Sequence, residues 1–344
     1  MYHVKTMNKI SKIGLAELDE RFEISDTMEH EDAILVRSAK LHDYDFPAEL
    51  KCIARAGAGV NNIPLDRAAD AGIVVFNAPG ANANGVKELT IAALLLASRK
   101  ISQGITWVKE QSAAGADVAA VVEKGKSAYV GPEIMGKTLG VVGLGAIGVL
   151  VANAAAALGM KIVGYDPFLS VTHALNLTPG VEVVDTLPEL YAKADYISLH
   201  LPMNDATRGT LNEAAFAAMK DGVRIVNLAR GELVDTPALK AALDSGKVAC
   251  YVTDFPNGKI LRGKNVVAIP HLGASTPESE ENCAAMAAQE LRDYLVNGNI
   301  TNSVNLPNVS QDWSGIARVC IIHKNVPAML TKIMATLSDD NINV

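Results

Sequence analysis

The stretch "TLGVVGLGAIGVLVANAAAALG" (138–159) constrains the fold more than any other part of the chain. A run rich in β-branched residues comes first, three glycines follow at the spacing G-x-G-x-x-G, and an alanine-rich segment comes last. Glycines at this spacing allow a tight turn from a strand into a helix and a close approach of a ligand to the backbone. The helix then begins with unpaired N–H groups and the positive end of its dipole, which attract a phosphate. We therefore predict a strand, a pyrophosphate-binding turn and a helix.

An acid that would complete such a site is also present. The next hydrophobic run, "KIVGYDP" (161–167), ends in Asp166, close to the roughly 20 residues expected between the first glycine and an acid that binds ribose hydroxyls. A carboxylate here would repel a 2′-phosphate, and no arginine follows it in "YDPFLS" to compensate. The pattern favours NAD over NADP. The residues predicted to bind this cofactor are Gly143, Gly145, Ala146, Ile147, Gly148 and Asp166.

Short β-rich runs alternate with helical stretches along most of the chain. They fall into two blocks, between residues 33 and 77 and between 138 and 271, and a helical region rich in Ala and Leu (about 84–118) separates them. Such alternation predicts βαβ units and parallel sheets covered by helices. We predict an α/β fold with two doubly wound parallel-sheet lobes, one flavodoxin-like and one of the Rossmann type. The predicted boundaries are 1–98 with 277–305 for the first lobe and 99–276 for the second.

The C-terminal stretch is predicted to be a smaller module. "NITNSVNLPNV" (299–309) resembles a linker, and the pattern of residues 314–344 predicts a strand, a turn, an amphipathic helix and the beginning of a second strand. A partial βαβ unit of this kind cannot form a sheet alone. We expect either a truncated regulatory module or a segment that pairs with another chain.

Composition narrows the possible partners. The chain of 344 residues is 49% hydrophobic and 20% charged, which suits a globular protein with a large core. Its net charge of -7, without a dense Lys/Arg cluster, argues against nucleic acid or an anionic membrane, so a small-molecule ligand is expected. The longest apolar run, 90–98, is too short to cross a bilayer and predicts a buried helix. Four cysteines without metal-site spacing and a start without an apolar targeting region favour a reducing cytoplasm and no bound metal.

Two later motifs resemble a known family. "LARGELVD" (228–235) and "PHLGAST" (270–276), placed after the glycine turn, resemble the D-2-hydroxyacid dehydrogenase family. The resemblance implies that Arg230 binds the substrate carboxylate, and that His271 exchanges a proton with the 2-hydroxyl while a hydride moves to the nicotinamide. Both residue types suit these roles, because a planar guanidinium binds a carboxylate with two hydrogen bonds and an imidazole exchanges protons near neutral pH.

The resemblance covers nearly the whole chain and implies further site residues. "RAGAGVNNI" (55–63), "GYDP" (164–167) and "HKNVPAMLTKI" (323–333) resemble the members that oxidise 3-phospho-D-glycerate in the phosphorylated route to serine, where the tail belongs to an ACT regulatory domain. The first lobe would then bind the substrate. The helical region between the lobes resembles the dimerisation segment of the family, so a homodimer or higher homo-oligomer is expected. The implied substrate-binding residues are Arg55, Gly57, Gly59, Val60, Asn61 and Lys126, together with Arg230 and His271, and Arg55 and Lys126 are the cations for the phosphate. The further implied cofactor-binding residues are His200, Pro202, Thr207, Ala229, Asp254, Gly273 and Ala274.

One position departs from the family pattern. Members usually carry a glutamate shortly after the strand-end aspartate, and it hydrogen-bonds the catalytic histidine, whereas this chain has "DFPNGKIL" (254–261) and no glutamate between Asp254 and His271. The leading interpretation is NAD-dependent oxidation of a phosphorylated 2-hydroxy acid. Two alternatives stay open: a reductase of an unphosphorylated acid such as hydroxypyruvate or glyoxylate, and a NAD-sensing binding protein without turnover.

Overall fold

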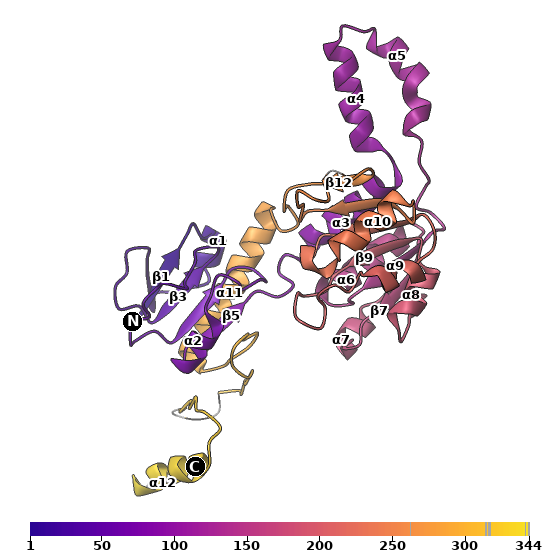
Figure 1. The fold of residues 1–344 in the computed structure, drawn as a ribbon. Helices are drawn as coiled ribbons and strands as arrows, with labels where there is room; N and C mark the ends of the chain where they lie inside the picture. The colour runs from indigo at the N-terminus through magenta and orange to yellow at the C-terminus, as the bar shows by residue number, and fades with distance from the viewer. Residues whose placement is uncertain (262, 314, 316–317, 341, 343–344) are drawn as a thin grey trace. The chain divides into compact units, whose positions relative to one another are not determined.

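The structure, a computed structural model, describes residues 1–261, 263–313, 315, 318–340 and 342 (Figure 1). Its strands are β1 (Tyr2–Met7), β2 (Phe22–Ser25), β3 (Ala33–Val36), β4 (Cys52–Arg55), β5 (Val74–Asn77), β6 (Thr138–Val142), β7 (Lys161–Tyr165), β8 (Glu182–Val183), β9 (Tyr196–Leu199), β10 (Val223–Asn227), β11 (Val248–Thr253) and β12 (Val266–Ala268). Its α-helices are α1 (Lys12–Leu15), α2 (Leu65–Asp70), α3 (Ala83–Ser98), α4 (Ile101–Ala113), α5 (Val118–Gly125), α6 (Ala146–Ala157), α7 (Val171–Leu175), α8 (Leu187–Lys193), α9 (Glu213–Ala218), α10 (Thr236–Asp244), α11 (Pro277–Asn297) and α12 (Met329–Asp339), and η1 (Lys126–Tyr129) and η2 (Gly231–Leu233) are 3₁₀ helices. The chain forms two compact units, Met1–Pro79 with Glu281–Val344, and Gly80–Glu280.

The first unit is built on a parallel five-stranded sheet in the order β2-β1-β3-β4-β5. This is the flavodoxin-like order. The hydrophobic runs of β3 and β4 are buried, as expected for a parallel sheet covered on both faces. The hydrophobic pattern predicts β3, β4 and β5 but not β1 and β2, whose residues are mostly half-exposed and include alternating polar side chains. Strands of this kind lack the continuous hydrophobic run by which a buried strand is recognised.

The second unit is built on a parallel seven-stranded sheet in the order β12-β11-β10-β9-β6-β7-β8. Without β12, this is the dinucleotide-binding order: the chain runs outward from β6 to β8 and then returns to β9 on the other side of β6. All the strands predicted here are present, whereas β8, with two exposed residues, was missed. The prediction of an α/β fold with two doubly wound parallel sheets is confirmed.

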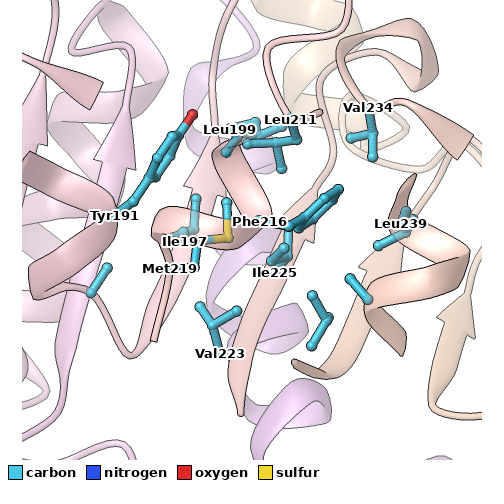
Figure 2. Close-up of a cluster of buried hydrophobic side chains, with 14 of the residues drawn as sticks. Tyr191, Ile197, Leu199, Leu211, Phe216, Met219, Val223, Ile225, Val234 and Leu239 are labelled. Carbon is cyan, nitrogen blue, oxygen red and sulfur yellow. The ribbon is translucent and has the colours of Figure 1, made fainter. Parts of the chain in front are cut away.

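Helices cover both faces of the second sheet. On one face, Ile197 of β9 and Ile225 of β10 pack with Phe216 of α9 in the cluster shown in Figure 2. On the other face, Tyr196 and Val226, the neighbours of these residues along the two strands, pack with α3 and α6. Successive strand residues point to opposite faces, so one short run supplies both cores. With both faces covered, a ligand reaches the sheet at the ends of its strands.

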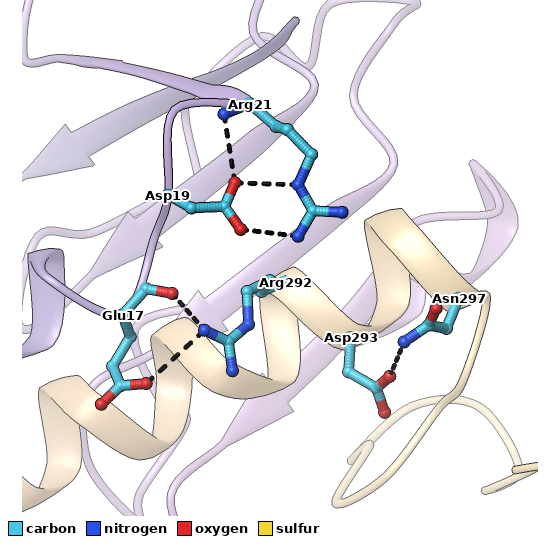
Figure 3. Close-up of polar contacts among 6 residues, drawn as sticks. All are labelled: Glu17, Asp19, Arg21, Arg292, Asp293 and Asn297. Atoms are coloured by element: carbon cyan, nitrogen blue, oxygen red, sulfur yellow. Dashed lines mark hydrogen bonds and ion pairs between the residues drawn. The ribbon is translucent and has the colours of Figure 1, made fainter.

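An arginine holds α11 to the connection between β1 and β2 within the first unit. Arg292 donates a hydrogen bond from Nη1 to the backbone oxygen of Glu17 (2.6 Å) and lies 3.7 Å from the carboxylate of the same residue (Figure 3). In the same connection, Arg21 donates from Nε and Nη2 to Asp19 at 2.8 and 2.6 Å, and these bonds lower the pKa of Asp19 to about 2. Two arginines thus add polar contacts to a connection that also buries Ile10 and Leu18.

The stretch that resembles a linker, 299–309, lies against the first sheet. Ser303 forms a β-bridge with Phe76 of β5. Asn305 accepts a hydrogen bond from the N–H of Val75 and donates one to the backbone oxygen of Ile73, both at 2.9 Å. The asparagine side chain therefore satisfies backbone groups at the edge of β5, and the segment covers an edge that would otherwise be open.

The two units differ from the predicted lobes. The second unit ends at Glu280 instead of 276, residues 314–344 fall in the first unit, and the largest difference lies at the first boundary. Residues 80–98, which include α3, belong to the second unit, whereas the predicted boundary placed them in the first lobe. The helix contacts α6, β10 and β11 and contributes Ala93 and Leu94 to a core of the second unit. It contains the longest apolar run of the sequence, which is thus part of a buried helix. Across the described residues, no helix is long and apolar enough to cross a membrane.

The C-terminal stretch contains the predicted helix, α12, but the described residues 318–328 form no strand. A strand needs a partner for its backbone N–H and C=O groups, and none pairs with this stretch in the described part of the chain. A second strand was expected to begin near the end of this stretch, where residues 341, 343 and 344 lie outside the described residues. The ACT-like module therefore stays a prediction.

A buried glutamate on α11 gives a pH-dependent stability. Glu290 is 6% exposed; its Oε1 accepts a hydrogen bond from Asn302 (2.6 Å), whereas Oε2 has no partner among the described residues. Burial raises the pKa of Glu290 to about 7 from 4.5. The folded state therefore binds this proton more tightly than the unfolded state does, and the stabilising contribution is lost as the pH rises between these two values.

We expect Glu290→Gln to remove this dependence, because glutamine stays neutral. As the pH rises from 5 to 8, the free energy of unfolding of the variant, relative to that of the unmodified chain, should increase by about 1–2 kcal/mol. Calorimetric unfolding across this range measures the difference. Glu278→Gln, at an exposed position of the same helix, is the matched control. A parallel pH dependence in both Glu290→Gln and the unmodified chain would show that Glu290 is ionised in the folded state.

Candidate active site

Most of the predicted site residues lie at one edge of the second sheet. All seven strands run parallel, so their carboxyl ends share an edge. β6 leads into the glycine turn, β7 into Asp166, β9 into His200, β10 into Arg230, β11 into Asp254 and β12 into His271. β6 and β9 are the neighbours at which the chain reverses its direction of winding, and ligands of such folds bind in the crevice at this point.

The three glycines of the turn are required for different steric reasons. Gly143 has φ of 93°, and a Cβ there would lie 2.6 Å from the backbone oxygen of His200. A Cβ on Gly148 would overlap the backbone oxygen of Gly143. A Cβ on Gly145, in contrast, would meet no atom within 4 Å. The first and third glycines are needed for the fold, whereas the second leaves space beside the beginning of α6.

Asp166 is fixed beside this turn. Its Oδ2 accepts a hydrogen bond from the N–H of Leu144 (2.9 Å) and its Oδ1 accepts one from the N–H of Phe168 (2.8 Å). Each carboxylate oxygen has further acceptor capacity, so the group can also bind hydroxyls. Ala146 and Ile147 follow Gly145 of the turn and begin α6. Within the described residues, no side chain caps the first turn of this helix. Backbone N–H groups and one carboxylate therefore lie at the same turn.

We expect Asp166→Ser to narrow the preference for NADH over NADPH by about 10-fold or more, because the carboxylate repels a 2′-phosphate. Fluorescence titration of the two reduced cofactors measures this ratio. Asp185→Ser, at an exposed position in the same unit, should leave the ratio unchanged. Equal affinities for both cofactors in the unmodified chain would contradict the role given to Asp166.

His200, Pro202 and Thr207 shape the loop after β9. The ring Nε2 of His200 lies 2.9 Å from Oγ of Ser198, and burial lowers the pKa of His200 to about 4. A ring that stays neutral near pH 7 suits a residue that shapes a loop better than one that carries protons. Thr207 donates from Oγ1 to the backbone oxygen of Pro202 (2.6 Å) and accepts from the N–H of Asn204 (2.9 Å). The loop is therefore ordered beside Gly143, against which His200 packs.

Arg230 is presented by an asparagine that the sequence analysis missed. Asn227, fully buried at the end of β10, donates from Nδ2 to the backbone oxygen of Arg230 (2.8 Å) and to the hydroxyl of Tyr251 (3.1 Å). Its Oδ1 accepts from the N–H of Ala229 (3.2 Å). Arg230 itself donates from Nη1 to the backbone oxygen of Ala229 (2.6 Å). One buried side chain thus forms the turn that carries both predicted residues.

Asp254 is a buried acid beside the predicted catalytic pair. It is 2% exposed, and neither of its carboxylate oxygens meets hydrogen-bond geometry with a described residue. Burial raises its pKa, while the charge of His271, the nearby N–H of Gly273 and the charge of Arg230 act in the opposite direction. A buried carboxylate without a partner is costly, so such a group is expected where a ligand supplies the missing hydrogen bonds.

His271 and the residues that follow it complete the edge. The imidazole is exposed, and its centroid lies 4.5 Å from the ring centroid of Phe255. Gly273 is buried, and a Cβ added at this residue would contact Val86 and Asp254. Ala274, the next residue, is half-buried. The structure thus brings Arg230, Asp254 and His271 together within the second unit.

In the first unit, β4 leads into the predicted substrate loop. Arg55 donates from Nε to the backbone oxygen of Arg37 (3.1 Å), and its guanidinium covers Gly57, where a Cβ would overlap Nη1. Asn77, which the sequence analysis missed, donates from Nδ2 to the backbone oxygen of Ala58 (2.6 Å) and so holds this loop at the end of β5. The loop continues through the other predicted residues, Gly59, Val60 and Asn61.

Lys126 belongs to the second unit, at the beginning of η1. Its Nζ is 2.5 Å from Oε2 of Glu123, and both side chains are exposed. In the same helical arm, the rings of Trp107 and Tyr129 are 5.3 Å apart and join α4 to η1. Within the described residues of its own unit, no hydrogen bond or ion pair joins Lys126 to another predicted site residue.

Comparison with known proteins settles the family. Residues 91–273, more than half of the 344, match the model of the D-isomer specific 2-hydroxyacid dehydrogenase, NAD binding domain. The chain belongs to the D-isomer-specific 2-hydroxyacid dehydrogenase family. The matched range contains the glycine turn, Asp166, Arg230 and His271, and its cofactor is NAD.

Several relatives within this dehydrogenase family cover most of the chain. The D-3-phosphoglycerate dehydrogenase of Methanocaldococcus jannaschii is 34% identical over 99% of this chain and 64% of its own length. That of Archaeoglobus fulgidus is 39% identical over 81% of this chain and 52% of its own length. This chain therefore spans about half to two-thirds of the length of these two curated relatives.

Two solved structures of the family have the same fold. The NAD⁺-bound 3-phosphoglycerate dehydrogenase of Entamoeba histolytica has a TM-score of 0.68 and 26% identity, covering 89% of this chain and 99% of its own. A glyoxylate reductase from Paecilomyes thermophila has a TM-score of 0.72 and 29% identity, covering 88% of this chain and 98% of its own. The likeness extends over both units and so supports the whole two-sheet architecture.

The residues of the second unit fit NAD. The space at Gly145 and the uncapped first turn of α6 suit a pyrophosphate, and Asp166 suits the ribose hydroxyls. The unpartnered oxygens of Asp254 suit the amide N–H groups of a carboxamide. These three features lie at the ends of β6, β7 and β11, along the carboxyl edge where ligands of doubly wound folds bind.

Proposed function

We propose that the chain oxidises 3-phospho-D-glycerate to 3-phosphooxypyruvate with NAD, the first step of the phosphorylated route to serine. The observation that carries the proposal is the placement of Arg230 and His271 beside the buried Asp254 at the carboxyl edge of an NAD-binding sheet. The names of the relatives support the substrate, since those described above are D-3-phosphoglycerate dehydrogenases.

In this reaction each side chain has a distinct task. Arg230 binds the carboxylate of the substrate through its planar guanidinium. Neutral His271 accepts the proton of the 2-hydroxyl, and bound NAD supplies the acceptor for the hydride from carbon 2. The charges of Arg230 and His271 both act on Asp254, which provides a compensating negative charge when the imidazole becomes protonated.

The first unit recognises the rest of the substrate. Backbone N–H groups of the loop that contains Gly57, Gly59, Val60 and Asn61 bind the carboxylate, and Arg55 binds the phosphate. Lys126 is the second candidate cation, contributed by a partner subunit in a homodimer that forms through the α4–α5 arm. Exposed apolar residues of this arm, Ile101 and Ile105, suit such a contact.

One assay separates this function from its two alternatives. NADH formation is measured with 3-phospho-D-glycerate and with D-glycerate at equal concentrations, and NADH oxidation with hydroxypyruvate and glyoxylate. The proposal expects turnover of the phosphorylated acid with the highest kcat/KM. Preference for the unphosphorylated acids would instead favour the activity named for the glyoxylate reductase. NADH binding without turnover of any acid would favour a NAD-sensing protein.

We expect Arg55→Ala to raise KM for 3-phospho-D-glycerate by about 10-fold to 100-fold with little change in kcat, because the phosphate is remote from the hydride. Steady-state kinetics with D-glycerate, which has no phosphate, provides the internal control, and its KM should change far less. An unchanged KM for the phosphorylated acid would show that another cation binds the phosphate.

A further inference from the structure

The predicted catalytic histidine, His271, contacts the aromatic ring of Phe255. The family pattern provides a glutamate for the catalytic histidine, and the segment after Asp254 has none. In its place, the ring of Phe255 lies against His271, with 4.5 Å between ring centroids and 48° between ring planes. The same ring lies under Arg230, whose Cζ is 5.6 Å from the Phe255 centroid. One neutral side chain thus contacts both residues of the predicted pair.

The position of Phe255 is determined by the end of β11. Its N–H donates a hydrogen bond to Oγ1 of Thr253 (3.0 Å), and Thr253 is fully buried. The preceding residue, Asp254, is buried, with 2% of its surface exposed. The side chain of Phe255 is half-buried. A Cβ added at Gly231, next to Arg230, would be in ordinary van der Waals contact with the Cβ of Phe255. The backbone of Phe255 is thus held at the end of β11, and its ring lies against His271 and Arg230.

We propose that Phe255 is a positioning residue that orients His271 and Arg230, in the place of the missing glutamate. This inference rests on the proposed function for its catalytic consequence but not for the contact itself. An aromatic ring attracts an imidazole by offset or tilted packing and a guanidinium by its negative face. It therefore restricts both side chains to the orientations in which they meet one substrate.

A neutral ring also differs from a glutamate in its effect on protonation. A carboxylate close to an imidazole favours the charged imidazolium, whereas phenylalanine does not. The charged groups of the neighbouring strand ends are Asp254 and Arg230, and Asp254 interacts electrostatically with both Arg230 and His271. Because oxidation requires the neutral imidazole as base, the acidic limb of kcat/KM marks its protonation.

The test compares three substitutions of Phe255. Phe255→Leu should lower kcat roughly 3-fold to 10-fold and leave KM for NAD unchanged, whereas Phe255→Tyr should retain kcat because the ring contact remains. Phe255→Glu should move the acidic limb of kcat/KM upward by about one pH unit or more, since it returns a carboxylate to the histidine. Phe46→Leu, which removes a similar arginine–aromatic contact with Arg67 in the first unit, is the matched control and should change none of these. Full activity of Phe255→Leu with an unshifted limb in Phe255→Glu would overturn the proposal.

A second readout does not depend on turnover. The ring current of Phe255 should shift the imidazole proton resonances of His271, assigned by their loss in His271→Asn, and Phe255→Leu should return them toward solvent-exposed values. Identical His271 resonances in the unmodified chain and in Phe255→Leu would show that the two rings are not in contact. A shift without turnover would leave the contact established and would count against the proposed function alone.

Discussion

His271→Asn is expected to lower kcat by about 100-fold to 10,000-fold while KM for NAD changes little, because the variant loses the group that accepts the hydroxyl proton. Asparagine keeps a polar side chain of similar size but cannot accept a proton near neutral pH. The residue is exposed at the end of β12, so its replacement should not destabilise the fold. Stopped-flow measurement of NADH formation would separate a lower rate of the chemical step from any change in the rate of NADH release.

His30→Asn is the matched control for this substitution. His30 has φ of 60°, a conformation that asparagine tolerates, and it lies on the surface of the first unit. Its kcat should equal that of the unmodified chain. A kcat of His271→Asn within a few-fold of the unmodified value would assign the proton to another group.

Substitutions in the glycine turn should have the second large effect, on stability and on NAD binding. Two variants test it, and each adds one methyl group to a different glycine. Gly148→Ala places its Cβ on the backbone oxygen of Gly143, so it should destabilise the second unit by about 2 kcal/mol or more and abolish NAD binding. Gly145→Ala places its Cβ in open space, so the fold should keep its stability. Its affinity for NADH should nevertheless fall about 10-fold or more, because the methyl group occupies the approach of the pyrophosphate.

Thermal unfolding without cofactor and calorimetric titration with NADH measure the two effects separately. The account predicts loss of both stability and affinity in Gly148→Ala, and loss of affinity alone in Gly145→Ala. Unchanged affinity in Gly145→Ala would show that the cofactor does not approach this turn.

Asp166 could be predicted from the sequence pattern because it follows a hydrophobic run at the spacing of a ribose-binding acid, whereas Arg230 and His271 were expected from the resemblance of their motifs to the family. Asp166, Arg230 and His271 come directly after runs that are recognised as buried strands, and a parallel sheet brings such ends to one edge. The glycine spacing is informative because it stands between a hydrophobic run and a helical stretch. These parts of the site and the fold class therefore needed no knowledge of contacts between distant residues.

The residues that support the site could not be predicted in the same way. Asn227 and Asn77 are asparagines at the ends of strands, a common position for asparagine, and their roles depend on which backbone oxygen lies opposite. Phe255 is adjacent in sequence to the expected acid, but its contact with His271 joins two different strands. Similarly, the cover that 299–309 forms over β5 depends on tertiary pairing, which local composition does not reveal.

The most direct measurement of the central claim follows the hydride itself. The chain is incubated with NAD and 3-phospho-D-glycerate that carries deuterium on carbon 2, and the reduced cofactor is analysed by mass spectrometry. The account predicts deuterium in the cofactor formed by the unmodified chain, and at least 100-fold slower accumulation in His271→Asn. A reduced cofactor without deuterium, or no reduced cofactor from a chain that binds NADH, would contradict the claim that this site oxidises the 2-hydroxyl of the phosphorylated acid.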